Sequence, residues 1–188
     1  DRPNYLLHQT VHGKPLVAGY ISRDDPRTLA ELAPVFQHFR HLSPDIIALD
    51  LAGQGRQVLH DLGVRWVVLD RYQMPASPGN ITREYTVATT AQIFGDQPPA
   101  YQDDRITAYE VLPPARNAPF LILGQGWTPF DAERRSRAFE DAAEVIVRAP
   151  EAGAGVLRVT LAPGSAPLVA DEAGDRFMLP LALRAGDN

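Results

Sequence analysis

The sequence predicts an α/β domain followed by a small all-β domain, and two changes of pattern along the chain support this prediction. Up to about residue 112, apolar residues recur at helical spacing or gather in short aliphatic runs, which is typical of helices alternating with buried strands. After the proline-rich stretch 113–119, helical spacing ends and short strand-like runs follow. We therefore expect domains at 1–112 and 113–188, the first containing a compact βαβ unit and a mixed sheet, the second sandwich-like.

The expected βαβ unit lies in the first half. After an amphipathic helix at 26–42, whose apolar residues follow three- and four-residue steps, the aliphatic run 45–51 has the composition of a buried strand. A turn at Gly53 to Gly55 and a short helix at 57–62 lead to a second strand at 64–69. Because such crossovers are normally right-handed, we expect the two strands to pair in parallel.

A further helix, a hairpin and the later strands complete the expected elements. Asn80 is suited to cap a helix that runs to Phe94, and a turn at Asp103 and Asp104 divides a hairpin over 100–112. Later strands are expected at 120–123, 144–148, 156–161 and 177–183. The chain begins at Asp1 without an initiator methionine and stops soon after the last strand, so we expect a piece of a longer protein with a truncated sandwich.

The amino-acid composition argues against several classes of function. The net charge of the 188-residue chain is −5 and charged residues make up 22%, which argues against a nucleic-acid partner or a polybasic membrane surface. There is no cysteine, and this excludes disulfides, thiolate metal sites and cysteine nucleophiles. No apolar run reaches the roughly 18 residues that would span a bilayer.

The predicted turn at Gly53 and Gly55 is the first candidate site. With Asp70, at the end of the next predicted strand, these glycines stand where a dinucleotide fold has its phosphate-binding turn and ribose-binding acid. Val58 occupies the position of the third glycine, and the helix is short for such a crossover. A plain tight turn is therefore the favoured interpretation, with a nucleotide-binding domain or enzyme as the alternative.

No catalytic residue, cofactor or metal site is predicted. His8 and His12 have the spacing of a zinc-protease helix, but Gln9 stands where that motif has its catalytic glutamate. No serine lies in a Gly-x-Ser-x-Gly nucleophile elbow. Whether the parent protein is an enzyme stays open.

The most distinctive stretch is 12–23. It holds the chain's only lysine, Lys14, together with His12, Tyr20 and Arg23, and it precedes the first predicted helix. These cationic, polar and aromatic side chains are suited to collect an anionic or sugar-like group. The simpler interpretation is an edge strand and loop in which Lys14 is solvated and Arg23 pairs with a neighbouring aspartate.

This stretch also carries a resemblance to a family. Residues 9–23, Gln-Thr-Val-His-Gly-Lys-Pro-Leu-Val-Ala-Gly-Tyr-Ile-Ser-Arg, resemble the segment that opens the C-terminal extracytoplasmic region of certain bacterial polytopic membrane proteins. These are predicted glycosyltransferases of the GT-C or YfhO-like kind. Residues 62–70 and 100–111 match in the same order, and Gly126 and Trp127 are similar to the family's terminal module.

The resemblance implies a non-catalytic accessory domain on the outer face of a bacterial membrane, because the catalytic acids of such proteins are expected in the membrane portion. The expected partners are the membrane-embedded portion of the same parent chain and a glycan or lipid-linked sugar. His12, Lys14, Tyr20 and Arg23 would contact that ligand, and Trp127 would be a platform on which a sugar stacks. A core or interdomain anchor is nevertheless the favoured interpretation of Trp127, because large aromatic side chains bury well. A purely structural module is a further alternative for the whole chain.

Overall fold

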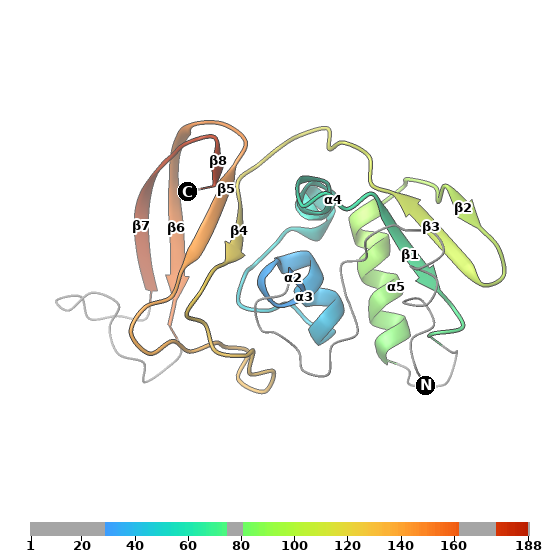
Figure 1. Cartoon of the computed structure of the whole chain (residues 1–188), viewed down its shortest axis with the longest axis horizontal. Helices are drawn as coiled ribbons and strands as arrows, with labels where there is room; N and C mark the ends of the chain where they lie inside the picture. Colours follow the sequence, from blue (N-terminus) through green and yellow to red (C-terminus); the bar gives the residue numbers. More distant parts are fainter. Residues whose placement is uncertain (1–28, 75–80, 162–175, 188) are drawn as a thin grey trace.

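The fold was analysed in a computed structural model that describes residues 29–74, 81–161 and 176–187. Helices occupy the middle of the molecule, with a small sheet on one side and the strand-rich C-terminal part on the other (Figure 1). Every strand pair in the described residues is antiparallel. The predicted mixture of helices and strands is confirmed, whereas the division into an α/β domain and a sandwich-like domain stays a prediction.

The helix predicted at 26–42 is interrupted within its described part. It is divided into α2 (Leu29–Leu32) and α3 (Pro34–His41), with Ala33 extended between them at φ −99° and ψ 132°. Pro34 explains the break, because a proline lacks the N–H of a helix interior and disfavours helical geometry in the residue before it. Pro34 instead occupies the start of α3, where its fixed φ suits a first turn.

The strand predicted at 45–51 is wrong. Residues 45–50 form no regular element, and Leu51 already opens helix α4 (Leu51–Asp61). Asp50 caps this helix, since its Oδ1 accepts the backbone N–H of Gly53 at 3.1 Å. The expected turn at Gly53 and Gly55 is therefore wrong as well, because both glycines lie inside α4.

The small sheet is built from β1 (Trp66–Asp70), β2 (Tyr101–Gln102) and β3 (Ile106–Glu110), in the order β1-β3-β2. The hairpin predicted over 100–112 is confirmed by the pairing of β2 with β3. The parallel βαβ pair is wrong, because residues 45–50 before α4 form no strand and β1 pairs antiparallel with β3. Helix α5 (Ile81–Phe94), predicted from Asn80, connects β1 to this hairpin.

The later strands lie close to their predicted places. They are β4 (Phe120–Leu123), β5 (Val145–Ala149), β6 (Gly153–Thr160), β7 (Arg176–Leu183) and β8 (Gly186–Asp187). They form two sheets, one in the order β4-β5-β8 and the other pairing β6 with β7. An apolar cluster joins the sheets, and it contains Val147, Ala149, Leu183, Leu121 and Leu181.

The main core includes residues from both sides of residue 112. Leu59 of α4 and Phe94 of α5 are 1% and 4% exposed, and they share one apolar cluster with Phe120 and Ile122 of β4. Gly55 lets α4 approach α5 closely, since a Cβ at this position would lie 2.9 Å from Cγ1 of Ile93. The helices and the first of the later strands are thus packed together.

The proline-rich stretch 113–119 is fastened to α4. The buried side chain of Gln57 donates to the carbonyl oxygen of Ala118 at 2.8 Å and accepts the N–H of Ala118 at 2.9 Å. Gln54 adds a hydrogen bond to the carbonyl oxygen of Pro119 at 3.0 Å. The side-chain amide of Gln57 thus donates one hydrogen bond to the backbone of Ala118 and accepts another from it. These bonds hold the segment that leads into β4 against α4.

A buried histidine lies between two helices. His38 of α3 is 6% exposed, and its Nδ1 lies 2.7 Å from the hydroxyl oxygen of Tyr85 on α5. Its Nε2 is buried without a hydrogen-bond partner in the described part of the chain. Burial lowers the pKa of His38 below 6.5, because the charged ring would lose its hydration there.

We expect this histidine to make the fold less stable in mild acid. Below pH 6.5 the unfolded chain takes up a proton on His38 that the folded chain does not, so the free energy of unfolding falls as the pH falls. Above that pH the contribution is fully present. Urea unfolding across this range should show a shallower pH dependence for His38→Gln than for the parent chain. Equal slopes for His38→Gln and the parent chain would contradict the prediction.

Candidate functional site

Trp127 belongs to a long excursion of the chain, residues 124–144, between β4 and β5. The two arms of this excursion are hydrogen-bonded to each other near their base, from Gly124 N to Glu144 O at 2.9 Å. Further out, Thr128 N donates to Ala138 O at 2.8 Å. The chain therefore leaves β4 in an outgoing arm and comes back to β5 in a returning arm, and the two arms are hydrogen-bonded to each other.

Arg137 fastens the excursion to the helices. Its side chain is 3% exposed, and its Nε and Nη2 bind the fully buried carboxylate of Asp45 at 2.9 and 2.6 Å. Nη2 also lies 3.2 Å from Oε2 of Glu31, and Nη1 donates to the carbonyl oxygen of Thr128 at 2.9 Å. Burial alone would lower the pKa of Arg137, but the hydrogen bond and charge of Asp45, followed by those of Glu31, outweigh it and raise the pKa.

An aromatic ring and a histidine complete the surroundings of Arg137. Phe130 of the excursion lies under the guanidinium group, with Cζ 5.9 Å from the ring centroid. The ring of His41 lies 4.8 Å from that of Phe130, and its Nε2 is 3.3 Å from Oδ2 of Asp45. The excursion therefore meets α2 and the loop after α3 through charged contacts, and α3 through an aromatic contact.

Trp127 is held by two contacts of its own. Its indole Nε1 donates to the carbonyl oxygen of Glu144 at 2.7 Å. Its ring meets Phe139 edge to face, with the centroids 5.6 Å apart and the planes at 76°. Because the only polar atom of the indole is used internally, the ring can offer a ligand its face but no hydrogen bond.

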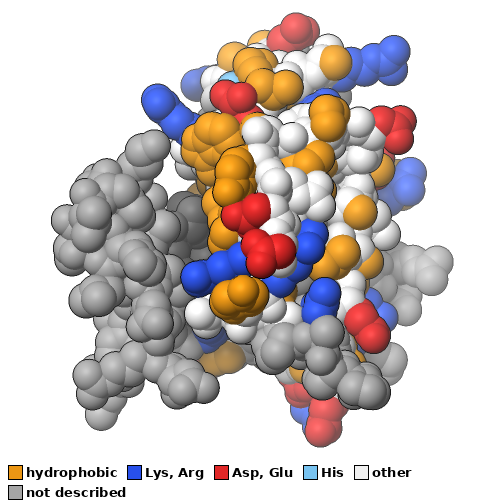
Figure 2. Space-filling model, turned by 90° about the vertical axis from the view of Figure 1, so that its right-hand side faces the viewer, with side chains coloured by type: hydrophobic (Ala, Val, Ile, Leu, Met, Phe, Trp, Pro, Cys, Tyr) orange, Lys and Arg blue, Asp and Glu red, His pale blue; other side chains and the backbone are white. Residues whose placement is uncertain are grey.

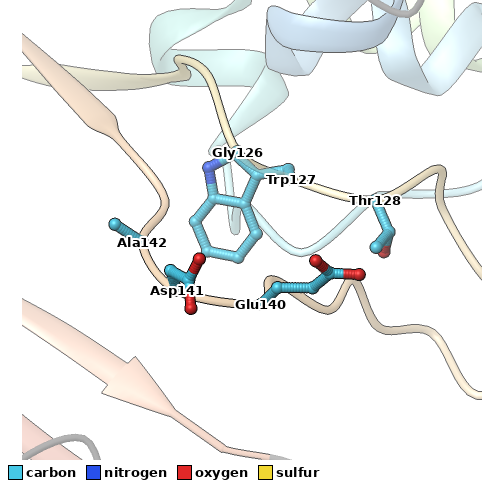
Figure 3. A pocket seen from close by; sticks show the side chains of 6 residues that line it. All are labelled: Gly126, Trp127, Thr128, Glu140, Asp141 and Ala142. Carbon is cyan, nitrogen blue, oxygen red and sulfur yellow. The ribbon is translucent and has the colours of Figure 1, made fainter.

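A shallow hollow of about 380 Å³ opens beside this ring. Figure 3 shows the indole among side chains of the returning arm, and the hollow is lined by Gly126, Trp127, Thr128, Glu140, Asp141 and Ala142. Gly126 has φ +90°, and a Cβ there would collide with the carbonyl oxygen of Ala142. Only glycine therefore lets the two arms approach at this point, which places the acidic residues next to Trp127.

Sequence reasoning named Trp127 but missed the acidic residues beside it. Glu140 and Asp141 are exposed, and neither forms a hydrogen bond or ion pair with another described residue. Their adjacency to Phe139 in the sequence was visible, but a pair of acidic residues in a loop is usually just solvated. Only the pairing of the two arms brings them to the tryptophan.

The other predicted ligand-binding residues, His12, Lys14, Tyr20 and Arg23, lie outside the described residues. Their approach to Trp127 therefore stays a prediction.

The nucleotide-binding alternative depends on Gly53, Gly55 and Asp70, and each of these residues makes a contact within the fold. The N–H of Gly53 is used by the Asp50 cap, and Gly55 faces Ile93. Arg105 binds Asp70 through two nitrogens, Nε to Oδ1 at 3.0 Å and Nη2 to Oδ2 at 2.6 Å. The hydrogen bond from Arg105 is the main reason that the pKa of Asp70 is lowered. The strand predicted at 45–51 and the turn predicted at Gly53 and Gly55, on which this alternative depends, are not formed, because both glycines lie inside α4.

A second tryptophan lies on the outer face of the small sheet. Trp66, Val68 and Tyr101 are 45%, 56% and 54% exposed there. Figure 2 views the molecule from the side of this sheet and shows hydrophobic side chains at the surface among charged ones. Trp66 is not among the residues that line the hollow beside Trp127, so it is a matched control for Trp127.

Within residues 29–74, 81–161 and 176–187, no group of three or more histidine and carboxylate side chains is placed to bind a metal ion. In the same ranges, no helix combines the length and apolar character needed to cross a membrane. Comparison with protein-family models, curated proteins and solved structures finds no match for the chain. The function is therefore argued from its own residues.

Proposed function

We propose that this chain is a non-catalytic accessory module that binds or positions a glycan or lipid-linked sugar beside the membrane-embedded portion of its parent protein. The parent would be a glycosyltransferase-like protein, and the module would lie on the outer face of a bacterial membrane. In this proposal an α/β domain precedes a sandwich-like β domain, and the sugar binds at the excursion 124–144. The resemblance of residues 9–23, 62–70 and 100–111 supports the membrane setting.

The observation that carries the proposal is the hollow beside Trp127, where an indole face lies together with two carboxylates that have no partner among the described residues. A sugar ring has an apolar face of C–H groups that stacks on an aromatic ring, and its hydroxyls donate hydrogen bonds to carboxylates such as Glu140 and Asp141. The rigid contacts of Trp127 with Glu144 and Phe139 orient the platform before the ligand arrives. Because the hollow is open and shallow, we expect weak binding that orients a sugar without enclosing it.

Binding of a glycan should be visible at Trp127 and absent at Trp66. Each indole N–H gives its own NMR signal, so titration with oligosaccharides of neutral hexoses, N-acetylhexosamines and hexosamines reports on both tryptophans at once. We expect the Trp127 signal to shift while the Trp66 signal stays. Trp127→Ala should abolish binding, whereas Trp66→Ala should retain it.

Two outcomes would contradict the proposal. Binding that survives Trp127→Ala would place the sugar elsewhere, and the absence of any response to glycans would favour the purely structural module. Thermal stabilisation by a dinucleotide, lost in Asp70→Ala, would favour the nucleotide-binding alternative. Thermal unfolding of both tryptophan variants checks that a loss of binding is not a loss of folding.

A further inference from the structure

The hollow beside Trp127 is negatively charged as well as aromatic. Two carboxylates, those of Glu140 and Asp141, line it. No arginine is among the residues that line the hollow. Arg137, on the same returning arm, is directed to Asp45 and Glu31 instead. A ligand in the hollow thus lies near the carboxylates of Glu140 and Asp141, and no lining residue carries a positive charge that would neutralise them.

We propose that this hollow selects a sugar that carries a free, protonated amine, such as a hexosamine, over its N-acetylated or neutral counterpart. The inference rests on the proposed function, because it names the sugar class for the same site. An ammonium group is attracted both to the face of an indole and to carboxylates. The remainder of the sugar ring still stacks on Trp127, so one ligand satisfies both features of the hollow.

The same charges disfavour other ligands. N-acetylation removes the positive charge, and a neutral hexose gains stacking and hydrogen bonds only. A uronic acid or a nucleotide phosphate brings like charge toward Glu140 and Asp141 and is repelled. A lipid-linked sugar would therefore place its sugar in the hollow and keep its phosphate outside.

The test compares the affinities of the whole chain for sugar oligomers of equal length. The readout is the NMR signal of the Trp127 indole N–H. We expect a glucosamine oligomer to bind about tenfold more tightly than the N-acetylglucosamine oligomer, since both the cation–π contact and the ion pairs are exposed and modest. The difference should shrink in high salt, because exposed charges are screened. A lysine oligomer of the same charge should bind more weakly than the amino sugar, as it lacks a ring to stack.

Each outcome separates the inference from the proposed function. Equal or tighter binding of the acetylated or neutral oligomer overturns the amine preference and leaves glycan binding intact. Lysine-oligomer binding as tight as that of the amino sugar also overturns the inference, because the hollow would then attract any cation. If no sugar moves the Trp127 signal, the proposed function itself fails.

Substitutions identify the groups responsible. The double variant Glu140→Gln with Asp141→Asn should reduce the preference for the amine from about tenfold to about twofold or less while neutral sugars bind as before. Glu133→Gln removes one charge from the excursion outside the hollow, and it should keep the full preference. All three side chains are exposed, so these variants should fold normally. A preference that persists in the double variant would overturn the inference.

Discussion

Replacing Arg137 with alanine should lower the free energy of unfolding by about 3–5 kcal/mol, the usual result of removing one partner from a buried ion pair. The carboxylate of Asp45 is fully buried and would lose its arginine in a place that water hardly reaches. Glu31, which is 13% exposed, would lose one of its two arginines and keep Arg40 at 3.3 Å. The carbonyl oxygen of Thr128 would lose its donor as well. Urea unfolding at neutral pH measures the change.

Arg134→Ala is the matched control for this prediction. Arg134 lies three residues away on the same excursion, its side chain is 83% exposed, and its nitrogen is 3.8 Å from Asp131. An exposed pair of this kind contributes less than about 1 kcal/mol. Arg137→Lys should fall between the two, because an ammonium group cannot make the two-nitrogen contact with Asp45. Equal stability of the Arg137→Ala and Arg134→Ala variants would show that the excursion does not depend on this contact.

The Arg137 contacts also link the stability of the fold to the candidate site. They join the returning arm of the excursion to Asp45 in the loop before α4, across 92 residues, and to Glu31 in α2, across 106 residues. The same arm carries Glu140 and Asp141, so its position relative to Trp127 depends on this anchor. Under the proposed function, loss of Arg137 should therefore weaken sugar binding even though Arg137 does not line the hollow.

Sequence patterns predicted those strands whose ends are set by neighbouring residues in the chain. The alternation of residues 106–110 and the apolar run 120–123 gave β3 and β4, because a turn or a glycine bounds each of them. The run 45–51 misled because its aliphatic residues resemble a strand, whereas Asp50 caps a helix that begins at the next residue. Once that strand is absent, the parallel pairing predicted for β1 has no partner.

Long-range pairing could not be predicted from the sequence. Nothing local to Arg137 distinguishes it from Arg134 and Arg135, and only the folded chain brings it to Asp45. Trp127 was singled out by its residue type and by the family resemblance, but the charge of its surroundings depends on how the two arms of the excursion pair. The sequence therefore pointed to Trp127 and not to Glu140 and Asp141, and a role of this residue in sugar binding stays a prediction.

Gln57→Leu should destabilise the protein by about 2–3 kcal/mol, because it removes two hydrogen bonds at once from the backbone of Ala118. Leucine fills similar space on the buried face of α4, so the loss reports on the polar contacts more than on packing. The N–H of Ala118 should also exchange with solvent faster, and this change is specific to the lost contact. Gln54→Ala removes only the more exposed hydrogen bond to Pro119, and a loss below about 1 kcal/mol is expected. If Gln57→Leu is as stable as Gln54→Ala and the exchange of Ala118 is unchanged, residues 113–119 are not held by α4 and behave as a free linker between the two halves.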